Sequence, residues 1–87
     1  MYRIKKWADF KDAAEKQMVR GARIFYMIEE NGNTTTVKIK VGCVGYVKEF
    51  NTANEKEKEE LNKIHGWLLR NGGIEVEEVI PDDMFFT

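Results

Sequence analysis

Within residues 34–41, polar and apolar side chains alternate with a period of two from Thr36 onward. Val37, Ile39 and Val41 share one side of the chain, and the polar residues between them share the other. Successive side chains of a β-strand point to opposite faces, so this pattern predicts a strand with one buried and one polar face. A chain built around such a strand needs a sheet whose apolar cover lies on one side only.

Two further strands are predicted next to this one, at residues 22–30 and 43–50. Asn31-Gly32-Asn33 is typical of a tight turn, because glycine and asparagine tolerate positive φ. Gly42 is expected to bend the chain into the third strand. Three consecutive strands with short connections favour an antiparallel meander.

Amphipathic helices are predicted on both sides of the strands, at residues 7–19 and 52–71. The first ends before Gly21, and its apolar stripe is Trp7, Phe10, Ala13, Ala14 and Met18. The second is expected to begin with a capping box formed by Thr52 and Glu55. Its predicted buried stripe is Leu61, Ile64, His65, Leu68 and Leu69.

The order of elements predicts an α+β fold, α-β-β-β-α, with a three-stranded antiparallel sheet. Both helices should cover one face and leave the other open. Residues 1–73 are expected to form one domain, and residues 74–87 an acidic tail with an edge strand followed by a disordered end. Phe85 and Phe86 are unusual in such a tail, so we expect them to dock on the domain or on a partner.

Few residues are suited to catalysis or metal binding. The single cysteine, Cys43, is expected to be buried in a strand, and the single histidine, His65, on the buried side of a helix. Their spacing matches no metal site, so we predict no catalytic residue, no metal and no cofactor. No apolar run approaches the ~20 residues that span a bilayer, and no signal-type segment is present, so we expect no membrane insertion and a cytoplasmic location.

Charge is distributed unevenly although the formal net charge is only −1. Residues 1–50 contain ten basic and six acidic residues, whereas residues 51–87 contain four and nine. Basic side chains predicted on surface strands or at their ends are Arg23, Lys38, Lys40 and Lys48. Lysines two residues apart in a strand are about 6–7 Å apart, which suits a phosphate backbone. The alternative is that they are merely solvated.

Apolar residues are predicted on the same open face. They are Phe25, Met27 and Tyr46, and exposed apolar groups of this size favour a covered surface, such as a partner interface. Stacking of aromatic rings on RNA bases is the alternative use.

The first helix contains the pattern Trp7-x-x-Phe10-x-x-Ala13-Ala14-Glu15-Lys16, which resembles the nine-kilodalton subunit family of the eukaryotic signal recognition particle. Ala22-Arg23, Gly32-Asn33, Val37-Lys38-Ile39 and Ile64-His65 are similar to its first strand, hairpin, second strand and second helix, in that order. The resemblance covers residues 6–71.

This resemblance implies a heterodimer with the homologous fourteen-kilodalton subunit that binds the Alu domain of the particle RNA. The family contributes to arrest of translation elongation while the ribosome is carried to the endoplasmic reticulum. The RNA-binding positions that it implies are Arg20, Arg23, Lys38 and Lys48, with Lys40 added from the strand pattern. Met27 and Glu29 depart from the family, which has basic residues there. The alternative function is a protein–protein interaction module, a homodimer or an adaptor, that uses the open face without RNA.

Overall fold

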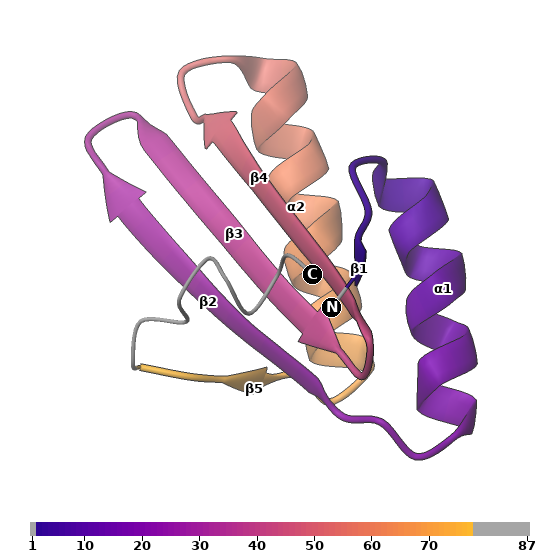
Figure 1. Cartoon of the computed structure of the whole chain (residues 1–87). Helices are drawn as coiled ribbons and strands as arrows, with labels where there is room; N and C mark the ends of the chain where they lie inside the picture. Colours follow the sequence, from indigo (N-terminus) through magenta and orange to yellow (C-terminus); the bar gives the residue numbers. More distant parts are fainter. Residues whose placement is uncertain (1, 78–87) are drawn as a thin grey trace.

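The computed structural model describes residues 2–77 and has two helices and a five-stranded sheet (Figure 1). The elements in chain order are β1 (Tyr2–Arg3), α1 (Trp7–Val19), β2 (Ile24–Asn31), β3 (Thr34–Val41), β4 (Val44–Asn51), α2 (Glu55–Arg70) and β5 (Ile74–Glu75). The predicted α+β class is confirmed. The predictions for the end of the tail, including Phe85 and Phe86, lie outside the described residues.

The sheet differs from the predicted three-stranded antiparallel layer. Its order is β1-β4-β3-β2-β5, and β1 and β5 pair in parallel with β4 and β2. Only β2, β3 and β4 form the expected antiparallel meander. β1 has two residues, which is too short for a periodic pattern to reveal, whereas β5 lies at the start of the tail, where an edge strand was expected. Backbone bonds hold β1 in place, from Tyr2 N to Cys43 O (2.8 Å) and from Ile4 N to Gly45 O (2.9 Å).

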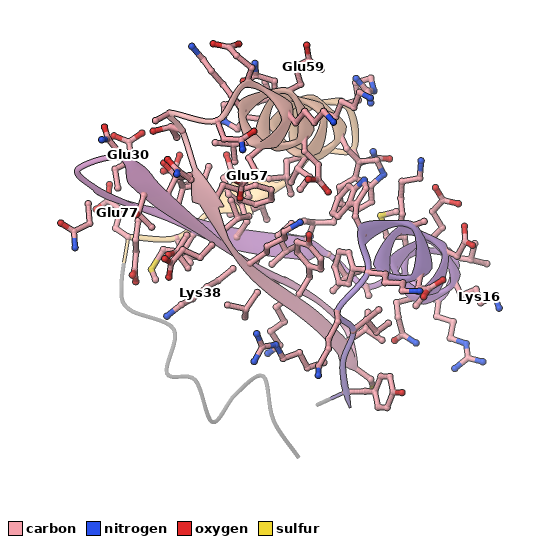
Figure 2. The ribbon with its side chains drawn as sticks, turned by 90° about the horizontal axis from the view of Figure 1, so that it is seen from above. Lys16, Glu30, Lys38, Glu57, Glu59 and Glu77 are labelled. Atoms are coloured by element: carbon pink, nitrogen blue, oxygen red, sulfur yellow. The ribbon has the colours of Figure 1, made fainter. Side chains whose placement is uncertain are left out.

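Both helices pack on one face of the sheet (Figure 2). The core combines Phe10 and Ala14 of α1, Ile64, Trp67 and Leu68 of α2, and the strand residues Ile24, Tyr26, Val37, Ile39, Val41, Val44, Tyr46 and Phe50. The strand members follow the period of two that one buried face requires. Four aromatic rings join the layers, with the Phe10 centroid 5.3 Å from that of Tyr46 and the Trp7 centroid 5.2 Å from that of Trp67.

Helix α2 begins later than predicted, and its buried side is rotated. Its N-cap is Asn54, whose Oδ1 accepts hydrogen bonds from Lys56 N (3.0 Å) and Glu57 N (3.3 Å). The predicted capping box is therefore wrong, and Thr52 instead donates its hydroxyl to Asn33 O (2.9 Å).

Three residues predicted to be buried are exposed. His65 and Leu69 each follow a buried residue of α2, and the rotation of about 100° per residue carries them off the stripe. The sequence stripe also omitted Trp67, which is buried. Cys43 is exposed because it occupies the two-residue turn between β3 and β4, closed by the pairing of Val41 with Val44.

Candidate nucleic-acid interface

The face of the sheet opposite the helices is the candidate site, and we call it the open face. Register places its side chains in rows across the strands, because paired residues of neighbouring strands point to the same side. One row contains Arg3, Gly45, Lys40, Phe25 and Ile74, the next contains Val47, Lys38 and Met27, and the third contains Glu49, Thr36 and Glu29.

Lys38 lies at the centre of the open face and points away from both helices (Figure 2). It is only 9% exposed, and its Nζ is 3.7 Å from Glu29 Oε1. The sequence pattern correctly placed Lys38 on this face, but it predicted neither the burial of the side chain nor the neighbouring Glu29 carboxylate. An approaching phosphate would have to compete with the Glu29 carboxylate for this ammonium group.

Lys40 and Arg3 share the row nearest the end of β3. Lys40 is half-buried and pairs with Phe25 on one side and Gly45 on the other, and Arg3 of β1 pairs with that glycine. The two cations are therefore two strands apart, about 10 Å at the backbone. Arg3 Nη2 donates a hydrogen bond to Val47 O (3.3 Å), which directs its side chain over β4. Arg3 is absent from the site predicted from the sequence, since nothing local predicts its strand of two residues.

Arg20 and Arg23 lie at the same end of the sheet. Arg20 is the C-cap of α1, and Arg23 immediately precedes β2, whose first residue pairs with the last residue of β3. Both are exposed. We call Arg3, Arg20, Arg23 and Lys40 the basic end. The acidic residues of the open face, Glu29 and Glu49, occupy the row that is four residues further along the strands, about 13 Å away.

Lys48 and Tyr46 are not on the open face, so their predicted placement is wrong. Lys48 pairs with Val37 and Tyr46 with Ile39, which both face the helices. Lys48 Nζ lies 3.4 Å from both carboxylate oxygens of Glu60 on α2. It also lies 5.0 Å from the centre of the Phe50 ring. This lysine is a cation between β4 and α2 rather than a ligand for a phosphate on the open face.

Tyr46 is completely buried between α1 and the sheet. Its ring centroid is 5.4 Å from that of Trp7. Burial raises the pKa of the Tyr46 hydroxyl to about 12, and the negative charge of Glu60 acts in the same direction. A side chain without accessible surface cannot contact a partner, so Tyr46 belongs to the core.

The other two predicted interface residues, Phe25 and Met27, do lie on the open face. Phe25 is 36% exposed and stands beside Ile74 of β5, which is 38% exposed. Met27 is only 6% exposed, although it is on the side opposite the helices. The accessible apolar surface is therefore at the β2–β5 edge, next to the basic end.

No group of three or more histidine, cysteine, aspartate or glutamate side chains among residues 2–77 could hold a metal ion. No helix in the same range is long and apolar enough to cross a membrane. Searches of protein-family models, curated proteins and solved structures found no match to the chain.

Proposed function

We propose that the chain is an RNA-binding subunit of a cytoplasmic signal recognition particle. It would bind the Alu domain of the particle RNA as a heterodimer with the fourteen-kilodalton subunit and contribute to elongation arrest. The observation that carries the proposal is a helix-free sheet face with Arg3 and Lys40 in one row of it, and with exposed Arg20 and Arg23 next to the same end of the sheet, which together form the basic end. The order α-β-β-β-α of the main elements agrees with what the family resemblance implies.

The basic end suits phosphate groups better than base edges. Lys40 and Arg3 are held by strand pairing, so their backbone positions are fixed before any ligand arrives. Arg23 adds an exposed guanidinium next to β2, and guanidinium groups can bind a phosphate through two hydrogen bonds. Contacts of this kind are independent of sequence and are weakened by salt.

The number of cations explains why a partner is needed. With Lys48 on the other side of the sheet and Lys38 beside Glu29, the basic end provides only a few phosphate contacts. Binding that depends on so few contacts is weak at physiological salt, because each contact adds a small increment. A second subunit that continues the surface would add contacts, and exposed Phe25 and Ile74 offer it an apolar edge.

The test compares two double charge reversals in the full chain co-purified with the fourteen-kilodalton subunit. Arg23→Glu with Lys40→Glu alters the basic end, and Lys58→Glu with Lys63→Glu makes the same charge change on exposed positions of α2. The measurement is the affinity for Alu-domain RNA over a series of salt concentrations. The first pair should weaken binding and reduce the salt slope by about 1 for each cation removed. The α2 pair should change both far less. Equal effects of the two pairs would refute the proposed surface.

A second candidate is a protein–protein interaction module that binds no RNA. The observation that favours it is the mixed chemistry of the open face, where Glu29 and Glu49 accompany exposed Phe25. In that case light scattering would show a stable homodimer of the purified chain, and the chain would not retard Alu-domain RNA in a gel mobility assay at low salt. Phe25→Ser would then dissociate the dimer, whereas the double reversal of Arg23 and Lys40 would not.

A further inference from the structure

The open face has a central region that no helix covers. Met27 and Lys38 pair with each other there, and Val47 flanks Lys38 on the other strand. Met27 and Lys38 are 6% and 9% exposed, while both helices lie on the opposite side of the sheet (Figure 2). The face thus joins an apolar centre to the cations Lys38, Lys40 and Arg3 in adjacent rows.

Residues 78–87 have the complementary chemistry. Their sequence, Glu-Val-Ile-Pro-Asp-Asp-Met-Phe-Phe-Thr, contains five apolar side chains besides the proline and three acidic ones, and it has no basic residue. Asp82 and Asp83 stand next to Met84, Phe85 and Phe86. Such a segment can offer carboxylates to lysines and aromatic rings to an apolar surface in one short stretch.

Residues 78–87 begin beside the sheet, because the residues before them pair with β2. β5 pairs with β2, and Val76 N donates a hydrogen bond to Tyr26 O (2.9 Å), so Glu77 follows directly at the β2 edge of the sheet. Ten residues can extend over about 33 Å. The distance from β5 across four strand spacings to β1 is about 19 Å. The segment is therefore long enough to cross the whole open face.

We propose that residues 78–87 dock on the open face of their own chain, with Asp82 and Asp83 near Lys38 and Lys40 and with Phe85 and Phe86 against Met27 and Val47. Attachment at Glu77 favours this occupant over a separate molecule, because a short connection gives an effective concentration of order mM. Docking also supplies a cover for Met27, which is only 6% exposed although both helices lie on the other side of the sheet.

Docking has a consequence that depends on the proposed function. An acidic segment near Lys38 and Lys40 would compete with RNA phosphates for the same cations. Residues 78–87 would then lower the RNA affinity of the free chain. RNA together with the fourteen-kilodalton subunit would displace this segment from the open face. The docking itself does not depend on RNA, so the two statements can be tested separately.

The first experiment uses the full chain without RNA. Cys43→Ser removes the only thiol, and Thr87→Cys accepts a nitroxide spin label at the last residue, which leaves Phe85 and Phe86 intact. Paramagnetic broadening of amide signals is then measured by NMR. We expect stronger broadening at Met27, Lys38 and Val47 than at Lys58 and Lys63, which lie on the outer side of α2. Equal broadening of both groups would overturn the docking.

A variant in the same spin-labelled background gives the matched control. Phe85→Ser with Phe86→Ser removes the apolar contacts while keeping the length, the charge and the label. We expect this pair to abolish the excess broadening on the open face, and persistence of the broadening would contradict the assigned contacts. The second experiment titrates Alu-domain RNA and the fourteen-kilodalton subunit. Loss of the excess broadening is expected, and its persistence in the RNA-bound state would overturn the competition but not the docking.

Discussion

The turn between β3 and β4 offers a quantitative test of how α1 is attached to the sheet. Gly42 has φ +58°, a left-handed conformation that L-residues with a Cβ rarely adopt. The side chain of Gln17 on α1 reaches this turn, and its Oε1 accepts a hydrogen bond from Cys43 N (3.3 Å). A Cβ on residue 42 would collide with that Gln17 oxygen. Gly42→Ala should therefore strain the backbone and displace Gln17.

The two effects can be added from general magnitudes. The left-handed conformation costs a residue with a Cβ about 1–2 kcal/mol. The lost hydrogen bond from Cys43 N adds about 0.5–1.5 kcal/mol. Gly42→Ala should thus lower the free energy of unfolding by roughly 1.5–3.5 kcal/mol. That is a large share of the total of about 4–13 kcal/mol that is usual for a domain of this size.

Gly32 in the β2–β3 turn is the matched control. It has φ +63°, but a Cβ there would meet no atom within 4 Å. Gly32→Ala should cost only the backbone term, about 1–2 kcal/mol. In a Gln17→Ala background, the cost of Gly42→Ala should fall close to that of Gly32→Ala, because the collision with Gln17 is gone and only a contact with Ala22 Cβ at 3.3 Å remains.

The assay is urea denaturation followed by circular dichroism, with the midpoint and slope compared between variants. An unchanged slope would show that the variants differ in stability rather than in the extent of unfolding. Equal losses for Gly42→Ala and Gly32→Ala in the wild-type background would refute the role assigned to Gln17.

Three further predictions concern the core and the helix cap. Phe10→Ala removes a completely buried ring that contacts Trp7 and Tyr46, and it should cost about 3–5 kcal/mol in thermal or urea unfolding; a loss below about 1 kcal/mol would contradict the packing. Asn54→Ala should lower the free energy of unfolding by about 1 kcal/mol in urea, because two amides of α2 lose their acceptor. Glu55→Ala should cost much less; a larger loss for Glu55→Ala than for Asn54→Ala would instead support the capping box of Thr52 and Glu55. Since the pKa of Tyr46 is raised to about 12, the folded state keeps this proton between pH 10 and pH 12 while the unfolded state loses it. The free energy of unfolding should therefore fall between pH 10 and pH 12 by up to about 3 kcal/mol more in wild type than in Tyr46→Phe. If the free energies of the two proteins, measured by urea unfolding, change in parallel with pH, this prediction is wrong.

Much of the fold could be predicted from local patterns. The alternation of β3 and the turn at Gly32 place β2 beside β3, and the apolar stripe of α1 correctly includes Phe10 and Ala14. These features depend on residues close in sequence, so periodicity is enough to find them. The same argument placed Lys38 and Lys40 away from the helices, since they alternate with core residues.

The content of the candidate site was less predictable. Lys48 and Tyr46 were expected on the open face, but register with β3 turns both toward the helices. Arg3 joins the site only because Tyr2–Arg3 pairs with the start of β4, which is distant in the sequence. A strand of two residues has no periodic signal, so no local rule could reveal this contact.

The sequence by itself therefore determined the number and order of the main elements, and which side chains of β3 face the helices and which face away from them. Tertiary structure decided which side of β4 is buried. In β4 both alternating sets contain apolar residues, with Val44, Tyr46 and Phe50 in one and Val47 in the other, so its own pattern allows either orientation. Pairing across the turn at Gly42 selects one of them, because a shift by one residue would turn the three larger side chains to the open face and Val47 into the core.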